Sequence, residues 1–157
     1  YLSLSSGSSV RDIVPLALID NGLRWHMRAY DRKNSRFGDF VINRISNAKA
    51  ATIPMAEEET LAQDEQWNHQ IELELVPHPE LPHPKAIEAD YGMSGGALRV
   101  VTRAAVAGYA LGRWNVDCSP KHPLDSNRHH LWLRNPQVLD NVESAVLAPG
   151  FSDKAKS

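Results

Sequence analysis

One stretch of strict alternation constrains the fold more than any other feature of the chain. From Leu23 to Asp31 apolar and polar residues alternate, as in a strand with one face in the core, because successive side chains of a strand point to opposite faces. The residues predicted to face the core are Leu23, Trp25, Met27 and Ala29. The residues predicted on the other face are Arg24, His26, Arg28 and Tyr30. Because this second row holds no carboxylate, we expect an anionic ligand, carboxylates from elsewhere, or plain solvation to balance its charge.

Other short strands surround this stretch. Strands are predicted over residues 1–5, 10–20 and 37–45, and Asp20-Asn21-Gly22 marks a tight turn, because Asn and Gly tolerate positive φ. Pro15 is compatible with an edge or a bulge. A chain segment with so many short strands exposes strand edges unless its sheet closes on itself. We therefore expect residues 1–54 to form a small β-barrel.

Charge divides the chain into a basic part and an acidic part. The net charge of all 157 residues is −2, which gives no overall attraction to nucleic acid or to a membrane. Residues 23–45 carry six Arg or Lys and two Asp, whereas residues 56–90 carry ten carboxylates and one Lys. We expect two modules, with residues 55–66 as an acidic linker that is mobile or forms a short helix.

The second module is predicted over residues 67–150, followed by a tail over residues 151–157. Strands are expected at residues 69–76, 97–102 and 129–134. Helices are expected at residues 84–91 and 103–114, and from Pro136 to Val146, where Asn135 provides a cap. This order indicates an α+β layer of the ferredoxin-like kind. The predicted fold class of the chain is thus mainly β, followed by α+β.

Few residue types of the chain suit metal binding or catalysis. Cys118 is the only cysteine, so an internal disulfide or a cysteine-based zinc cluster is excluded, and we expect a cytoplasmic protein. The seven histidines include His78 and His83, in a proline-rich loop, and the adjacent pair His129 and His130. None of these spacings suits a metal site, and no serine has a paired base nearby, so we expect no metal, no cofactor and no enzymatic activity.

The ends and the hydropathy of the chain indicate a piece of a longer protein. No apolar run approaches the ~18 residues of a membrane span, and no signal-peptide pattern is present, so we expect no membrane partner. The chain opens on Tyr1, inside a predicted strand. We expect a preceding segment.

Two segments of the first module resemble the core of a WYL domain. They are Gly22 to Asp31, with a glycine turn and a Trp-containing strand, and Arg36 to Ile45, the returning strand. The Arg24-Trp25-His26 form resembles the branch found in regulators of bacterial phage-defence operons, including BREX and CBASS. The segment from His69 to about Val146 resembles the C-terminal extension that accompanies these domains. His26 stands at the name-giving tyrosine of the family, and Gly38 stands where many members have arginine.

The resemblance implies a fold and a function. It implies an Sm-like (SH3-like) barrel that senses a nucleic acid or a nucleotide. It also implies that a winged helix-turn-helix precedes the barrel and contacts DNA. The whole protein would then be a homodimeric transcriptional regulator, and most simply a repressor of a phage-defence operon.

The residues themselves predict a site for an anion on the first module. The candidate ligand-binding residues are Ser3, Ser5, Arg24, His26, Arg28, Tyr30, Arg36 and Arg44. Arginines form forked hydrogen bonds to phosphate oxygens, serines add hydroxyls, and a tyrosine can stack on a base. His26, between two arginines, should resist protonation until a phosphate binds.

Three classes of function fit these observations. The first is the effector-sensing and dimerisation part of a transcriptional regulator. The second is a stand-alone barrel that binds RNA or single strands. The third is a structural dimerisation module whose basic face meets acidic residues such as Met55 to Glu65 of the same or another chain. As a separate alternative to a role in ligand binding, Arg44 would pair with Asp39 or Asp31.

Overall fold

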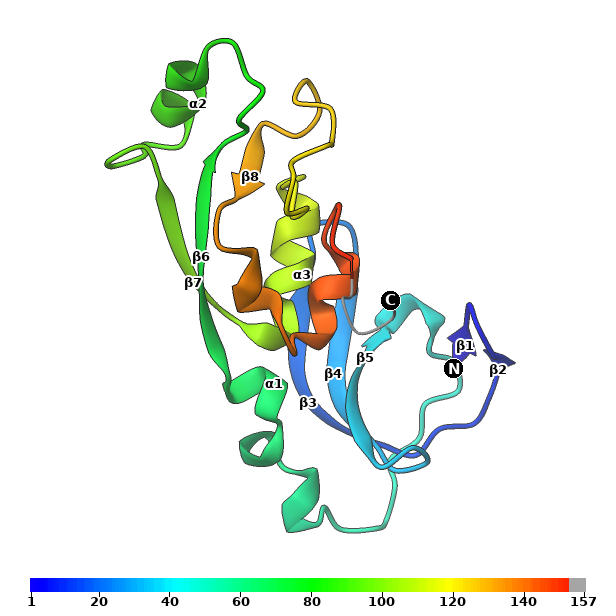
Figure 1. Cartoon of the computed structure of the whole chain (residues 1–157). Coiled ribbons are helices and arrows are strands. Elements are labelled where there is room, and N and C mark those ends of the chain that lie inside the picture. Colours follow the sequence, from blue (N-terminus) through cyan, green and yellow to red (C-terminus); the bar gives the residue numbers. More distant parts are fainter. Residues whose placement is uncertain (153–157) are drawn as a thin grey trace. The chain divides into compact units, whose positions relative to one another are not determined.

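The fold is described from a computed structural model, which describes residues 1–152 (Figure 1). The chain divides into two compact units, Tyr1–Glu65 and a second unit that starts at Gln66. Most of the predicted tail, residues 153–157, lies outside the described residues. Within residues 1–152, no helix is both long and apolar enough to cross a membrane.

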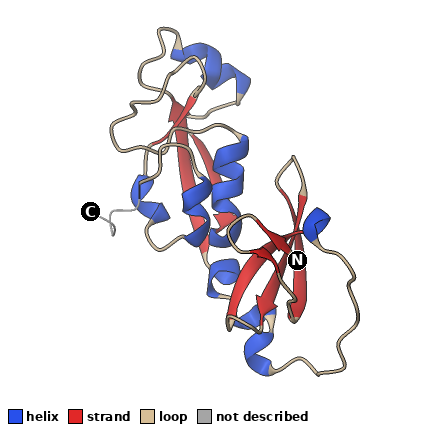
Figure 2. Cartoon of the chain, turned by 90° about the vertical axis from the view of Figure 1, so that its right-hand side faces the viewer, coloured by secondary structure: helices blue, strands red, loops and turns tan. Residues whose placement is uncertain are grey.

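The first unit is built on an antiparallel sheet in the order β3-β4-β5, labelled in Figure 1. The strands are the red arrows of Figure 2. Its strands are β3 (Ile13–Asp20), β4 (Trp25–Asp31) and β5 (Arg36–Val41), and a small hairpin precedes them, formed by β1 (Leu2–Ser3) and β2 (Gly7–Ser8). The register of β3 against β4 shifts between Pro15 and Ala17, so the proline lies at a bulge of an edge strand, one of the two places predicted for it. The described residues form no closed barrel, and the fold class is mixed α and β with antiparallel sheets.

The turn before β4 follows its sequence but is longer than predicted. The side-chain oxygen of Asn21 accepts hydrogen bonds from the backbone of Leu23 at 3.0 Å and of Arg24 at 2.9 Å. Gly22 has a φ of +80°, which requires glycine or a residue that tolerates the left-handed region. The strand therefore begins at Trp25, and Leu23 and Arg24 lie in the turn, which corrects their predicted place in the strand.

The alternation along β4 is present, but the prediction of its core face is confirmed only in part. Trp25 is 50% exposed and Leu23 is 83% exposed, whereas His26 is 4% exposed and Arg28 is 3% exposed. Of the residues predicted to face the core, only Ala29 is fully buried. Within the polar row His26 and Arg28 are buried, and Arg28 has acidic partners within the same unit. Trp25 and Leu23 are near the end of the hairpin, where the sheet stops.

After β5 the chain leaves the sheet earlier than predicted and then returns to it. A 3₁₀ helix, η1 (Ile42–Arg44), replaces the end of the predicted strand, so Arg44 lies on a helical turn. Further along, η2 (Glu57–Glu59) and η3 (Leu61–Gln63) precede α1 (Glu65–Asn68). We call residues 56–64, which contain η2 and η3, the acidic strap.

The second unit is a three-stranded antiparallel sheet with helices. Its strands are β6 (Gln70–Pro77), β7 (Leu98–Arg103) and β8 (Leu131–Leu133), in the order β7-β6-β8. Its α-helices after α1 are α2 (Pro84–Asp90), with proline in its first turn as predicted, and α3 (Ala104–Arg113). The final α-helix predicted from Pro136 is absent from the described residues, which instead form two 3₁₀ helices, η4 (Pro136–Leu139) and η5 (Glu143–Leu147).

The core of the second unit lies between the sheet and α3. Leu73, Leu75, Leu131 and Leu133 supply it from the strands, and all four are buried. The small residues of α3 allow a close approach to η5. Ser144 of η5 accepts a hydrogen bond from the Gly108 backbone at 2.9 Å and donates one to the Ala104 carbonyl at 2.6 Å.

Candidate anionic-ligand site

The register of the first sheet gathers the predicted polar row on one face. His26 lies opposite Val41, Arg28 opposite Asp39, and Tyr30 opposite Phe37. Directly opposite residues of an antiparallel pair point to the same face. This face therefore carries an imidazole, a guanidinium and a phenol, with the carboxylate of Asp39 beside the guanidinium.

Arg28 is the centre of a buried ion-pair group. Its Nε and Nη2 donate to the two carboxylate oxygens of Asp64 at 2.7 and 2.9 Å, and its Nη1 donates to Asp39 at 3.1 Å. Asp64 is 1% exposed. Burial by itself lowers the pKa of Arg28, but the hydrogen bonds and charges of Asp64 and Asp39 outweigh it and raise this pKa above the usual value. The charge of Arg28 is thus balanced within the unit.

Arg32, just after β4, forms a second forked ion pair. The sequence did not predict which carboxylate would be the partner of this arginine. Its Nε and Nη2 donate to the two carboxylate oxygens of Glu59 at 2.6 and 2.7 Å. The same guanidinium makes a weaker contact to Asp12 at 3.3 Å and a hydrogen bond to the Pro54 carbonyl at 3.0 Å. The hydrogen bonds from Arg32 lower the pKa of Glu59 to about 2, with help from the backbone N–H of Ala56. Arg28 and Arg32 thus both pair with carboxylates of the acidic segment, which is the contact that the third hypothesis includes.

His26 lies at the other end of the row, between two further cations. Burial is the main cause that lowers its pKa below 6.5, and the charges of Arg24 and Arg44 lower it further, whereas Asp39 acts in the opposite direction. The direction matches the sequence prediction, but its main cause is desolvation rather than the neighbouring arginines. Arg24 lies two residues before His26 along the chain, and Arg44 lies three residues after Val41, the residue opposite His26.

Three predicted cations have no acidic partner of the kind that Arg28 has. Within residues 1–152, no carboxylate forms an ion pair with Arg24, Arg36 or Arg44. Arg24 and Arg36 are exposed and Arg44 is half-buried. Arg36 lies opposite Asp31, five residues along β4 from His26, which places it about 16 Å away at ~3.3 Å per residue. Arg24 and Arg44 thus share one end of the hairpin, and Arg36 lies at the other.

The remaining predicted ligand residues have local contacts. The hydroxyls of Ser3 and Ser5 lie 3.1 Å apart, and Ser3 also accepts backbone hydrogen bonds within its own turn. Tyr30 is half-buried, and its ring meets that of Phe37 edge-on at 5.1 Å between centroids. The contacts of Ser3, Ser5 and Tyr30 are thus made with their own neighbours and not with Arg24 or Arg44.

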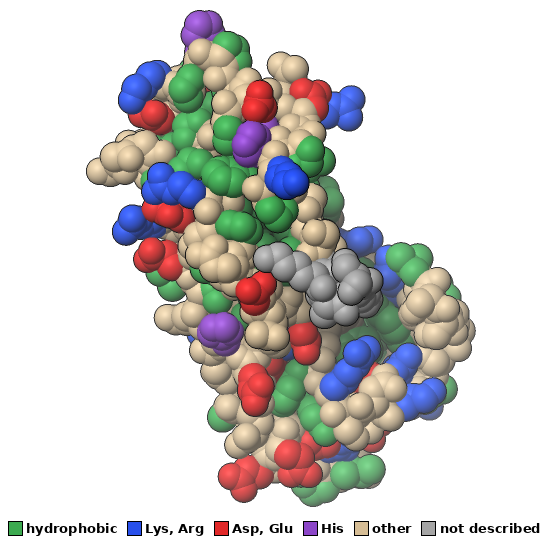
Figure 3. Space-filling view, viewed as in Figure 1, with side chains coloured by type: hydrophobic (Ala, Val, Ile, Leu, Met, Phe, Trp, Pro, Cys, Tyr) green, Lys and Arg blue, Asp and Glu red, His purple; other side chains and the backbone are tan. Residues whose placement is uncertain are grey.

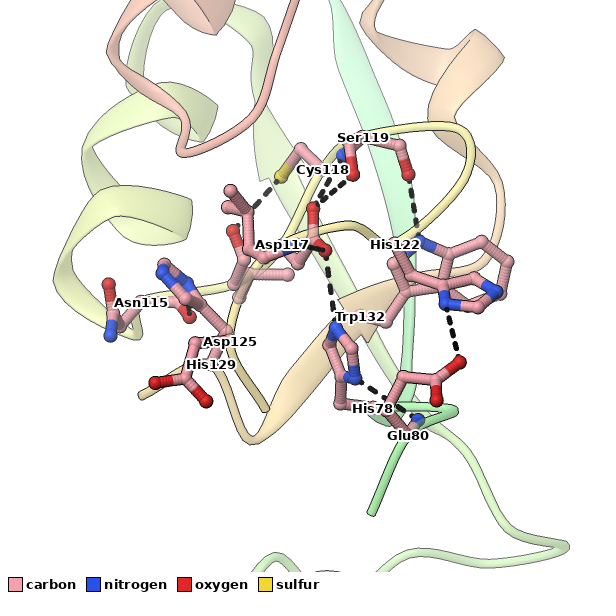
Figure 4. Close-up of polar contacts among 12 residues, drawn as sticks. His78, Glu80, Asn115, Asp117, Cys118, Ser119, His122, Asp125, His129 and Trp132 are labelled. Atoms are coloured by element: carbon pink, nitrogen blue, oxygen red, sulfur yellow. Dashed lines mark hydrogen bonds and ion pairs between the residues drawn. The ribbon is translucent and has the colours of Figure 1, made fainter. Parts of the chain in front are cut away.

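A different polar cluster, in the second unit, surrounds the fully buried Asp117 (Figure 4). This carboxylate accepts hydrogen bonds from the Ser119 hydroxyl at 2.5 Å and from the Ser119 and Leu124 backbones, and it lies 3.2 Å from the ring of His78. Nδ1 of His78 accepts from the backbone of Glu80 at 3.2 Å, so Nε2 carries the proton and donates to Asp117. Ser119 donates to the carboxylate and not to the imidazole, so the cluster lacks the nucleophile–base contact of a hydrolase and holds a loop against the end of β6.

The outer face of the second sheet is mixed in charge. Glu74 of β6 forms ion pairs with Arg99 of β7 at 3.1 Å and with Arg134 after β8. Basic and acidic side chains are interleaved over β6 and β7 on the face seen in Figure 3. This face therefore offers no concentrated charge for a nucleic acid.

Both units match known protein families. Residues 1–50 match the WYL domain, and residues 70–139 match the C-terminal dimerization domain of the BrxR transcriptional regulator.

Several relatives carry the name DNA-binding transcriptional repressor CapW. The relative from Escherichia coli (strain KTE188) is 34% identical over 125 residues, which cover 78% of this chain and 41% of the relative. The relative from Pseudomonas aeruginosa is 36% identical over 109 residues, covering 68% of this chain and 36% of the relative. The relative from Stenotrophomonas maltophilia is 32% identical over 131 residues, covering 82% and 41%. The chain thus spans about two fifths of the length of these relatives.

Proposed function

Because this chain consists of a WYL domain followed by a BrxR-type C-terminal dimerization domain, we propose that it is the effector-sensing and dimerisation part of a transcriptional repressor. The similarity to repressors named CapW supports this proposal, and none of these relatives is named as an enzyme. Since the chain spans only part of their length, contact with DNA is assigned to a winged helix-turn-helix upstream of residue 1. The operon controlled would belong to phage defence, as the WYL branch suggests.

The second unit makes the protein a homodimer in this proposal. The match of residues 70–139 to a dimerization domain supports it. In the finer proposal, this second unit is a ferredoxin-like layer. The first unit is an Sm-like barrel, which the three strands β3, β4 and β5 do not close by themselves. A symmetric dimer also suits a repressor, because two-fold DNA sites are read by two-fold proteins.

The first unit binds an anionic ligand of nucleotide or nucleic-acid type at the end of the β3–β4 hairpin. The observation that carries this proposal is that Arg24 and Arg44 lie at the His26 end of β4 and form no ion pair with a carboxylate of residues 1–152. Two guanidiniums without acidic partners are suited to forked hydrogen bonds with phosphate oxygens. Arg36 extends the site along the strand for a ligand with more than one phosphate.

A structural role for the basic face is the second candidate, and the ion pairs of Arg28 and Arg32 favour it. A binding measurement separates the two. The probe is a fluorescein-labelled single strand of eight deoxythymidylates, followed by fluorescence anisotropy at 50 mM salt.

The test variant is Arg24→Ala with Arg44→Ala, and the matched control is Lys33→Ala with Lys49→Ala. The control removes two charges from exposed lysines of the same unit. We expect the test variant to weaken binding at least tenfold and the control to weaken it less than threefold, because each direct phosphate contact contributes more than a distant charge. An equal loss of probe affinity in both variants would reject the site. A wild-type chain that dimerises but does not bind the probe would favour the structural role of the basic face.

A further inference from the structure

The acidic strap touches the basic strand through two forked ion pairs. Asp64 binds Arg28 with both oxygens, and Glu59 binds Arg32 with both oxygens, at 2.6 to 2.9 Å. A carboxylate and a phosphate present two oxygens to a guanidinium in the same geometry. The strap therefore places an anion on each arginine in the way that a phosphodiester would.

The two residues of the strap that are buried are the two that form these ion pairs. Of its nine residues, 56–64, only Glu59 and Asp64 are buried. The helices η2 and η3 have three residues each and contain no buried apolar side chain. Short 3₁₀ turns have little stability of their own, and a buried ion pair contributes little net stability because desolvation offsets the attraction. The contact between strap and strand is thus specific but exchangeable.

The acidic strap lies at the end of the first unit. Asp64 is the penultimate residue of the first unit, and α1 and β6 follow it directly. The ion pair between Asp64 and Arg28 therefore fixes the chain where the WYL unit ends and the dimerization unit begins.

We propose that the acidic strap is an internal occupant of an anion site formed by Arg28 and Arg32, and that a phosphodiester ligand of the WYL domain displaces it. This inference rests on the proposed function, since it takes the ligand to be an anion. Ligand bound at Arg24 and Arg44 reaches Arg28 along the same strand once the strap has left. Ligand binding and strap release are then coupled, and each favours the other.

The test compares two variants of the whole 157-residue chain with the same loss of charge. The variant Glu59→Gln with Asp64→Asn removes the anchoring carboxylates. The control Glu57→Gln with Glu58→Gln removes two exposed carboxylates of the same strap, part of the acidic surface over residues 57–65 in Figure 3. The probe is the labelled strand of eight deoxythymidylates described above.

The variant without anchors should bind the probe about tenfold more tightly than the control, because the ligand no longer competes with a closed strap. Affinity equal to or lower than that of the control would overturn the inference, since the ion pairs would then only support the strand.

Hydrogen exchange of the wild-type chain gives an answer even if the variant does not fold. The backbone amides of residues 56–64 should exchange faster when the probe is bound. Probe binding with unchanged exchange in the strap would overturn the inference and leave the proposed function intact. No binding by the wild-type chain or by either variant would reject the ligand class and the inference together.

Discussion

Replacement of Gly108 by Ala should destabilise the dimerization unit although alanine is the better helix former. A Cβ atom built on Gly108 would lie 1.7 Å from the carbonyl oxygen of Ser144 and 2.5 Å from its carbonyl carbon. Both are backbone atoms, so no side-chain rotation relieves the clash. Helix α3 and the η5 segment would have to separate by more than an ångström, and the hydrogen bonds that Ser144 makes to Gly108 and Ala104 would lengthen with them.

The magnitude follows from two opposing terms. The change from glycine to alanine inside a helix stabilises by about 1 kcal/mol. Overpacking in a core costs about 1–3 kcal/mol and more when backbone must move, to which the loss of the Ser144 contacts adds about 1–2 kcal/mol. We expect a net loss of about 1–4 kcal/mol, which lowers the Tm of a unit of this size by about 4–8 °C for each kcal/mol.

Thermal unfolding followed by tryptophan fluorescence is a suitable assay, since three of the four tryptophans, Trp67, Trp114 and Trp132, belong to the second unit. The matched control is Gly112→Ala, one turn later, whose added Cβ would lie 3.2 Å from the Leu147 carbonyl oxygen. This control should stay within about 1 kcal/mol of the wild-type chain, because a shift of a few tenths of an ångström relieves the contact. A Gly108→Ala chain as stable as the wild type would refute the close packing of α3 on η5.

Three further predictions concern titratable groups. Ligand binding should take up a proton near pH 6.5, because the lowered pKa keeps His26 neutral until a phosphate approaches; calorimetry in buffers of different ionisation heat measures this, and His26→Gln should abolish it. The pKa of about 2 at Glu59, set first by the hydrogen bond from Arg32, means that its stabilisation is complete above about pH 4.5 and is lost as the pH falls toward 2. Urea unfolding from pH 5 to 2.5 should show a smaller decline for Glu59→Gln than for the wild-type chain. Burial, with the charge of Asp117, raises the pKa of Cys118 to about 12, so Ellman's reagent at pH 8 should modify it at least about a hundredfold more slowly in the folded chain than in urea.

The sequence predicted local structure well where the signal was local. The turn at Asn21 and Gly22, the bulge at Pro15 and the helix α3 all follow from residues within a few positions of one another. The prediction of a helix from Pro136 was wrong, because its apolar residues can be buried equally well by one α-helix or by two 3₁₀ helices packed against α3. That choice depends on the backbone approach at Gly108, which lies more than thirty residues earlier in the chain.

The candidate site shows the same limit. Alternation along β4 correctly separated two faces, but it could not say which face is buried, because the partner of Arg28 is Asp64, 36 residues away. Trp25 looked like a core residue by type and is half exposed by position. The net charges of the two segments did indicate an acidic partner for the basic strand, but not which of its carboxylates would pair with which arginine.

The salt dependence of probe binding tests most directly whether Arg24 and Arg44 meet phosphates. For a single strand, the slope of log K against log salt concentration changes by about 0.7 for each phosphate contact. The slope for the strand of eight deoxythymidylates should therefore be shallower by about 1.4 in the Arg24→Ala, Arg44→Ala chain than in the wild-type chain. An unchanged slope would contradict the assignment of these two arginines to the ligand.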